Sequence, residues 1–215
     1  MTIVDELVAA VRALPDRPFV LGIAGPPGSG KSTLAGRLVE SMSSTAPDVA
    51  VAVAPMDGFH LSNHQLELQG LLDRKGIPET FDAAGYAALL ARVRQADRGV
   101  VYAPAFDRRL EEPVAGSHAI PPGRGLVVAE GNYLGIDTGP WPDVRAAIDE
   151  LWFLDVPLEE CAERCLHRRL DHGFDHATAE QRVATVDRPN GLIVHHSRDR
   201  ADRVLDPGTF AQLIG

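Results

Sequence analysis

Short apolar segments alternate along the chain with segments whose apolar residues recur at helical spacing. Residues 19–24, 49–54, 100–102, 126–130 and 151–155 are almost entirely apolar up to their last positions. Such segments are typical of strands that are buried on both faces of a parallel sheet. A weaker strand is expected at residues 203–205.

Helical stripes of apolar residues flank and separate these strands. The stripes cover residues 4–14, 34–42, 86–93 and 158–166, and a further helix is expected around residues 178–186. Ser62 and Gln65 form a capping pair for a short helix, and Asp82 caps the helix that carries the 86–93 stripe. Strands that alternate with helices predict an α/β fold with a doubly wound, mostly parallel five-stranded sheet and helices on both faces.

The length of 215 residues is typical of one domain with insertions, so we expect a single domain over residues 1–215. A polar insertion at about 58–81 follows the second strand. A long loop is expected at residues 104–122, and loops of this length usually carry function.

Charge and composition narrow the range of partners. The chain has 21 basic and 30 acidic residues, a net charge of −9, which excludes a general nucleic-acid or anionic-membrane surface. No apolar run approaches the length of a membrane span and the first residues lack a signal-peptide pattern, so a cytoplasmic protein is expected. Cys161 and Cys165 are expected to be reduced thiols of the core.

A glycine-rich motif follows the first predicted strand and opens a helix. It reads Gly25, Pro26, Pro27, Gly28, Ser29, Gly30, Lys31 and Ser32. This is the pattern of a phosphate-binding loop, whose backbone amides surround phosphates while the lysine reaches the outer phosphates and the serine holds Mg²⁺. We expect these residues and Thr33 to bind a nucleoside triphosphate.

The positions of the two lysines argue against one class of triphosphate-binding protein. A guanine-specific GTPase usually carries an Asn-Lys-x-Asp element, but Lys31 and Lys75 both stand in other segments. ATP is the expected triphosphate, and the sequence leaves another triphosphate donor open.

Carboxylates stand at the ends of three predicted strands. Phosphoryl transfer to a hydroxyl needs a base, a metal-binding carboxylate and mobile positive charge. Asp57, Glu130 and Asp155 all qualify by position, because ligands of open α/β sheets bind beyond the carboxyl ends of the strands. Asp57 also suits a plain turn and Glu130 a capping or core-edge carboxylate.

An ordered set of segments resembles the phosphoribulokinase, uridine kinase and bacterial pantothenate kinase family of P-loop kinases. The segments are residues 25–32, 56–59, 74–82, 104–107, 130–133 and 155–157, followed by Arg164 and Arg168. The set is most similar to a bacterial nucleoside/nucleotide kinase-like branch. The resemblance implies a P-loop NTPase fold with a small helical lid at about residues 164–186.

The resemblance also implies roles for individual residues. Asp57 would be the acceptor-side base, with Lys31 on the phosphates and Glu130 beside Mg²⁺. Arg164, with Arg168 or Arg169, would be the lid arginines that neutralise charge on the transferred group and contact ATP. An ordinary solvated helix face is the alternative for these arginines.

The acceptor side is less clearly marked. Candidate substrate-contacting residues are Phe59, His60, Lys75, Phe106, Asp107 and Tyr133. Lys75 lies in a stretch similar to the pantothenate kinase Lys-Gly-x-Pro-Glu segment, although a surface lysine is the alternative. Since Gly58 follows Asp57 where uridine kinases have serine, the acceptor stays open among nucleoside, pantothenate-like and sugar alcohols.

The main hypothesis is an ATP- and Mg²⁺-dependent kinase that acts on a hydroxyl of a small metabolite. One alternative is a nucleotide monophosphate kinase, whose phosphate acceptor would need an arginine clamp from Arg74, Arg92, Arg94 or Arg98. Another is an ATP-binding regulatory protein without catalysis. The resemblance leaves a homodimer open.

Overall fold

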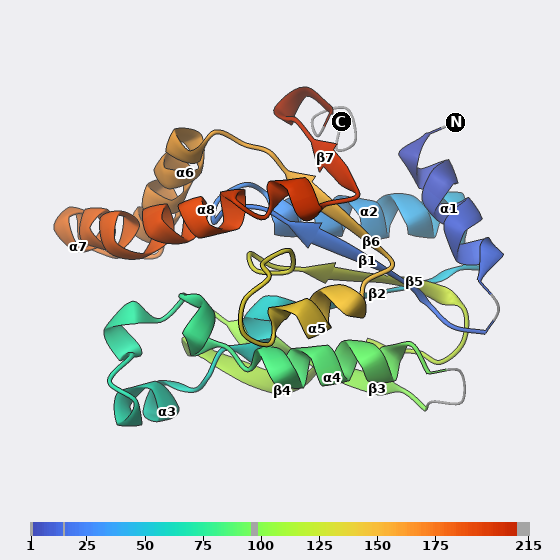
Figure 1. Cartoon of the computed structure of the whole chain (residues 1–215), viewed down its shortest axis with the longest axis horizontal. Coiled ribbons are helices and arrows are strands. Elements are labelled where there is room, and N and C mark those ends of the chain that lie inside the picture. Colours follow the sequence, from blue (N-terminus) through green and yellow to red (C-terminus); the bar gives the residue numbers. More distant parts are fainter. Residues whose placement is uncertain (1, 15, 96–98, 210–215) are drawn as a thin grey trace.

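The computed structural model describes residues 2–14, 16–95 and 99–209, with a five-stranded sheet at its centre (Figure 1). The strands are β1 (Phe19–Ala24), β2 (Ala50–Pro55), β5 (Gly125–Glu130), β6 (Glu150–Leu154) and β7 (Arg203–Leu205). They lie in the order β2-β5-β1-β6-β7, each parallel to its neighbours. β2 is an edge strand in which only Ala54 is fully buried, so the prediction that residues 49–54 are buried on both faces is wrong.

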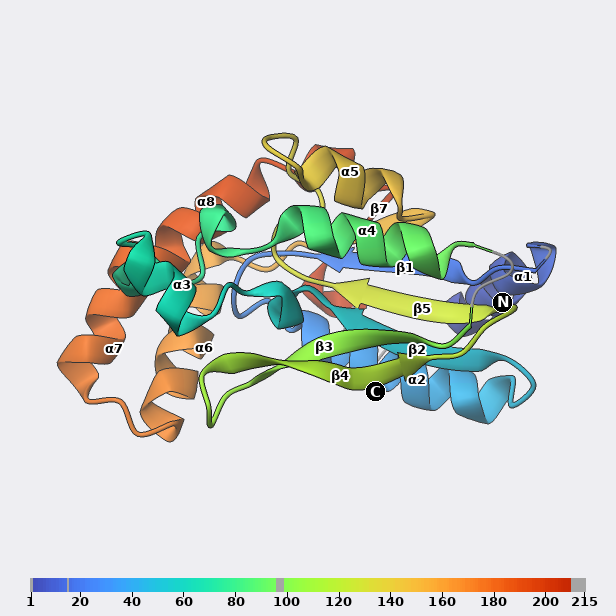
Figure 2. The ribbon, with the colours of Figure 1, turned by 90° about the horizontal axis from the view of Figure 1, so that it is seen from below.

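Helices cover both faces of the sheet (Figure 2). α1 (Ile3–Ala13) and α2 (Lys31–Thr45) pack on one face, and α4 (Ala83–Val93) and α5 (Trp141–Ala146) pack on the other. Successive side chains of a strand point to opposite faces, so Val20 joins the core under α4 and α5 whereas Leu21 joins the core under α1 and α2. The predicted fold class is therefore confirmed, although α5 was not predicted.

The third predicted strand lies outside the main sheet. β3 (Val101–Asp107) pairs antiparallel with β4 (Glu112–Ile120) in a separate two-stranded sheet, so the loop expected at 104–122 is wrong. Val101 and Ala103 are buried while Tyr102 between them is 60% exposed. This alternation belongs to a strand with one solvated face, and the weaker strand at the carboxyl-terminal end supplies the fifth member of the main sheet.

Helices on two sides extend beyond the carboxyl ends of the strands (Figure 1). They are α6 (Leu158–Asp171), α7 (His176–Arg182) and α8 (Arg188–His195) on one side and α3 (Asn63–Leu68) on the other. A π-helical turn joins α7 to α8, so the regular helix expected around 178–186 is wrong in its extent. The predicted caps are confirmed, since Ser62 accepts from the Gln65 N–H and Asp82 from the Gly85 N–H. Within the described ranges, every helix is too short or too polar to cross a bilayer.

Asp149 ties the amino-terminal segment and α4 to the sheet. Its carboxylate accepts two hydrogen bonds of 2.8 Å from Arg17 and one from the Val20 N–H, and it pairs with Arg94. Burial raises the pKa of Asp149, but the hydrogen bonds from Arg17 and Val20 and the two arginine charges outweigh burial, so its pKa is lowered.

We expect Asp149→Asn to lower the free energy of unfolding at pH 7 by about 2–3 kcal/mol, because two partly buried arginines lose their carboxylate. A carboxyl with a lowered folded-state pKa stabilises the fold above its unfolded pKa of about 4, and this contribution is lost as the pH falls through the folded value. The difference in urea unfolding should therefore shrink below about pH 4. Asp48→Asn, which removes an exposed pair with Arg12, should cost less than about 1 kcal/mol. Equal losses in both variants would contradict this interpretation.

Candidate active site

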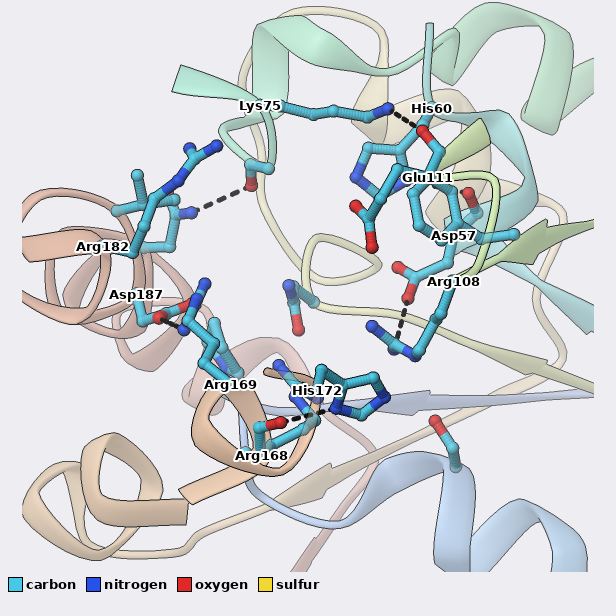
Figure 3. A pocket seen from close by; sticks show the side chains of 18 of the residues that line it. Asp57, His60, Lys75, Arg108, Glu111, Arg168, Arg169, His172, Arg182 and Asp187 are labelled. Atoms are coloured by element: carbon cyan, nitrogen blue, oxygen red, sulfur yellow. Dashed lines mark hydrogen bonds and ion pairs between the residues drawn. The ribbon is translucent and has the colours of Figure 1, made fainter. Parts of the chain in front are cut away.

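A cavity of about 210 Å³ opens at the carboxyl edge of the sheet, between helices α6 to α8 and the insertion (Figure 3). This is the edge at which open α/β sheets bind ligands. The predicted site residues that line it are Pro27, Gly28, Lys31, Ser32, Asp57, His60, Lys75, Phe106, Glu130, Arg168 and Arg169. The structure thus brings together residues that lie far apart in the sequence.

The glycine-rich loop packs closely between β1 and α6. Gly28 and Gly30 have left-handed φ angles of 83° and 98°, which glycine adopts without strain. A Cβ at Gly28 would lie 2.4 Å from the carbonyl oxygen of Cys161, so only glycine fits there. No side chain caps the start of α2 at Gly30, which leaves the first amides of the helix available to an anion.

Lys31 is buried beneath this loop. Its Nζ donates to the carbonyl oxygens of Gly25 at 3.0 Å and Pro26 at 2.9 Å. Burial lowers the pKa of Lys31, while the charges of nearby carboxylates oppose that effect. The buried Ser29 hydroxyl has no hydrogen-bond partner among the described residues. A loop with free helix amides, a buried cation and an unpaired hydroxyl fits a bound phosphate group.

Asp57 and Glu130 are neighbours because β2 and β5 run parallel in register. Pro55, at the end of β2, pairs with Glu130 at the end of β5. Asp57 follows two residues later in the 3₁₀ turn Met56–Phe59, with 38% of its side chain exposed. One carboxylate is therefore accessible from the cavity while the other is buried at the sheet edge.

The electrostatics of this carboxylate pair favour a bound cation. Burial, with the charge of Asp57, raises the pKa of Glu130 to about 7, whereas Lys31, a hydrogen bond from Ser32 and Arg108 act to lower it. The Ser32 hydroxyl and the carboxylates provide the hard oxygen ligands that Mg²⁺ prefers. A divalent cation beside them would relieve the repulsion, so these residues fit Mg²⁺.

α6 presents two of the three predicted arginines to the cavity. Arg168 and Arg169 line it, and both terminal nitrogens of Arg169 bind the buried carboxylate of Asp187. Arg164 lies one helical turn earlier and pairs with Glu160, outside the cavity lining. Arg164 Nη1 also donates to the Gly28 carbonyl oxygen at 3.4 Å. Arg164 therefore lies beside the phosphate loop without lining the cavity, and its role as a lid arginine stays a prediction.

Nine other predicted residues also lie outside the cavity lining. Four belong to the phosphate loop, namely Gly25, Pro26, Ser29 and Gly30, and the other five are Thr33, Phe59, Asp107, Tyr133 and Asp155. Phe59 packs on Tyr86 with ring centroids 4.8 Å apart, and the Tyr133 hydroxyl donates to the Gly76 carbonyl. Asp107 accepts from the N–H groups of its own turn, and Asp155 accepts from Arg198 Nε at 2.8 Å. Thr33 is exposed on α2. Phe59, Tyr133, Asp107 and Asp155 thus contact other parts of the protein in this structure, and their roles at the site stay predictions.

Several lining residues were not predicted as site residues. They are Gly76, Arg108, Glu111, Asn132, His172, Phe174, Arg182, Val186, Asp187 and Asn190. Arg108 directly follows the predicted Phe106-Asp107 pair and Asn132 lies in the 130–133 segment, so motif context marked these two. His172, Phe174 and Arg182 fall within the lid predicted at about residues 164–186, but nothing in the local pattern marked them individually, because only packing turns them toward the loop.

The tip of the β3–β4 hairpin reaches over the cavity. Arg108 Nη2 lies 3.8 Å from Asp57 Oδ2. Glu111, with φ of 53°, is the only non-glycine residue with positive φ among those described. Such a conformation costs free energy for a residue with a Cβ. Contacts with the surrounding structure therefore maintain the backbone conformation of the hairpin tip.

Known proteins share this arrangement of the chain. No protein-family model matches the sequence. The uncharacterized protein YggC of Escherichia coli is 35% identical over 204 residues, 94% of this chain and 83% of that protein. A candidate uridine kinase, C227.14 of Schizosaccharomyces pombe, is 34% identical over 195 residues, 88% of this chain and 82% of that protein. The crystal structure of a candidate fructose transport system kinase from Silicibacter sp. TM1040 is 36% identical with a TM-score of 0.83, covering 95% of this chain and 99% of that chain.

The buried charge of Glu130 should appear as a pH-dependent loss of stability. A carboxyl whose folded pKa is raised from 4.5 to about 7 binds more protons in the folded state, so stability falls as the pH rises through this interval. We expect the ligand-free Glu130→Gln variant to be more stable than the wild type at about pH 8, by on the order of 2 kcal/mol. In urea unfolding curves, the difference in stability between the variant and the wild type should vanish below about pH 4. The control variant Glu67→Gln, at an exposed position of α3, should show no such dependence on pH. A gain that is independent of pH would refute the raised pKa.

Proposed function

This chain belongs to the phosphoribulokinase, uridine kinase and pantothenate kinase family of P-loop kinases, and from this premise we propose that it transfers the γ-phosphoryl group of ATP to a hydroxyl of a small metabolite, with Mg²⁺ as cofactor. Membership makes the chain a small-molecule phosphotransferase with a hydroxyl acceptor. One observation carries the finer proposal: Asp57 opens into the same cavity as Lys31, Ser32, Glu130 and Arg168.

The donor side of the cavity would hold the triphosphate. The amides at the start of α2 and the Lys31 ammonium would bind phosphate oxygens in place of the two carbonyls that Lys31 now contacts. Arg168 would add positive charge from α6. When bound, Mg²⁺ supplies charge that offsets the phosphate oxygens, and Ser32 with Glu130 would hold it.

The acceptor side would activate the hydroxyl. Asp57 would accept the hydroxyl proton as the acceptor oxygen forms its bond to the γ-phosphorus and the bond from that phosphorus to ADP breaks. Arg108, whose Nη2 lies 3.8 Å from the Asp57 carboxylate, would keep Asp57 oriented. The accessible carboxylate of Asp57 would thus act as the base, and the buried carboxylate of Glu130 would bind the metal.

The geometry does not favour a phosphate acceptor held by the arginines of the middle segment. Arg74 and Arg92 do not line the cavity, and Arg94 is engaged by Asp149. Arg98 lies outside the described residues. Among the described residues of that segment, Lys75 is the only lysine or arginine in the cavity lining, so a hydroxyl acceptor is favoured over a nucleoside monophosphate.

The names of the relatives suggest the acceptor classes to test. One relative is named for uridine and one for fructose transport, and both compounds carry several hydroxyl groups. We propose an acceptor among nucleosides, pantothenate-like compounds and sugars. A screen of ATP consumption over these three classes would identify it.

We propose that residues 164–186 act as the lid. Gly173, in the turn between α6 and α7, has a left-handed φ of 86°, and Phe174 beside it lines the cavity. A non-hydrolysable ATP analogue with Mg²⁺ should slow tryptic cleavage within this region severalfold, because a closed lid is less accessible. Mass spectrometry of the fragments measures this, and equal cleavage rates with and without the analogue would argue against closure.

We expect Asp57→Asn to lower kcat by about 10²–10⁴-fold with little change in the KM for ATP, since the amide cannot accept the proton. Coupled detection of ADP with the acceptor from the screen measures both constants. Asp143→Asn, the same change at an exposed position of α5, should leave kcat and the KM for ATP unchanged. Unaltered turnover by Asp57→Asn would remove Asp57 from the role of base.

A further inference from the structure

Two cations lie at the end of the cavity away from the phosphate loop. Figure 3 shows Lys75 and Arg182 at one end of the cavity and Arg168 and His172 at the other. Lys75 belongs to the insertion and Arg182 ends α7, so they reach the cavity from opposite sides. Their charges are therefore placed beyond the groups that would hold ATP.

Neither cation has a carboxylate partner among the described residues. Lys75 Nζ donates to Asn63 Oδ1 and to the Glu111 carbonyl, both at 2.6 Å. Arg182 Nη1 donates to the Asp73 carbonyl at 2.8 Å. All three acceptors are uncharged oxygens, so these contacts position the two side chains without neutralising them.

Two other arginines that line the cavity differ in this respect. Arg169 is bound by the carboxylate of Asp187, and Arg108 lies beside Asp57. Arg168 also has no carboxylate partner among the described residues, but it lies at the opposite end of the cavity from Lys75 and Arg182. Lys75 and Arg182 are therefore the cations placed to bind an anion of the acceptor.

Their mutual repulsion supports the same conclusion. Burial lowers the pKa of Lys75 and the charge of Arg182 lowers it further, although Glu112 and Glu111 act in the opposite direction from beyond ion-pair distance. Glu112 is itself engaged by the Asn63 N–H at 2.9 Å. Two like charges held close together in a partly buried cavity are stabilised by an anion placed between them.

We propose that the acceptor carries an anionic group, a carboxylate or a phosphate ester, in addition to the hydroxyl that receives the phosphoryl group, and that Lys75 and Arg182 bind this anion. This inference rests on the proposed kinase function, in which the acceptor is the molecule that receives the phosphoryl group. The fork of Arg182 suits both anions, because guanidinium binds carboxylate and phosphate through paired hydrogen bonds. Neutral polyols would leave both cations unpaired and would bind more weakly.

Calorimetry on the full chain tests the anion site without turnover. A non-hydrolysable ATP analogue with Mg²⁺ first fills the phosphate loop, and inorganic phosphate or acetate is then titrated to distinguish the two anions. We expect at least one anion to bind, with the Kd raised at least tenfold in Arg182→Gln and partly restored in Arg182→Lys. Arg12→Gln, at an exposed arginine of α1, is the control and should bind as the wild type does. An absence of binding, or an unchanged Kd in Arg182→Gln, would overturn the proposal.

Matched acceptors provide the kinetic test. Glycerol is compared with glycerate and glycerol 3-phosphate, and fructose with fructose 6-phosphate. We expect the anionic member of a set to have a KM at least tenfold lower, and Arg182→Gln to raise that KM while leaving the KM for ATP unchanged. If neutral acceptors are phosphorylated and calorimetry detects no binding of phosphate or acetate, the anion site would be overturned while the kinase proposal would stand. Anion binding that Arg182→Gln removes, with no turnover of any acceptor, would support the site and count against the kinase proposal.

Discussion

A buried lysine and a buried carboxylate share the carboxyl edge of the sheet, and the properties of the cavity depend on this pair. Burial lowers the pKa of Lys31 and raises that of Glu130, and each charge partly offsets the shift of the other. In such a low-dielectric setting, charge interactions are much stronger than in water. A phosphate group or a divalent cation that enters the cavity therefore gains interactions that the ligand-free protein lacks.

The scaffold tolerates this charge because β1, and β5 up to Glu130, consist of apolar residues. All positions of β1 and β5 are buried, and both cores are built on their alternating side chains. Burial of apolar side chains on both faces of the sheet stabilises the fold and offsets the free-energy cost of the charged groups at the sheet edge. Stability and binding thus oppose each other at Glu130, as at many functional sites.

The carbonyl group of Gly76 connects the acceptor side with the helices opposite. The Gly76 oxygen accepts hydrogen bonds from the Tyr133 hydroxyl and from Asn190 Nδ2 at 2.9 Å. It thereby connects the insertion, the loop after β5 and α8. With the contact from Arg182 to Asp73, this arrangement holds the two sides of the cavity at a defined separation.

Features that depend on local pattern could be predicted from the amino-acid sequence. Apolar runs predicted the strands of the central sheet, Ser62 and Asp82 marked two helix starts, and the motif at residues 25–32 specified the phosphate loop. These succeed because strand burial, capping and loop conformation are set by residues close together in the chain. The same reasoning mistook β3 and β4 for a short strand and a loop, because an exposed antiparallel hairpin has a weaker pattern than a buried strand.

Which charged side chains share the cavity depends on contacts between elements that lie far apart in the chain. Asp155 met the same positional rule as Asp57 and Glu130, yet Arg198 holds it elsewhere. Arg164 and Arg168 lie on one face of α6, yet only Arg168 lines the cavity, whereas Arg164 pairs with Glu160 and contacts the Gly28 carbonyl. Arg182 reaches the insertion across 109 positions of the chain. Such partners are selected by packing between distant elements, and local spacing in a sequence carries no information about that packing.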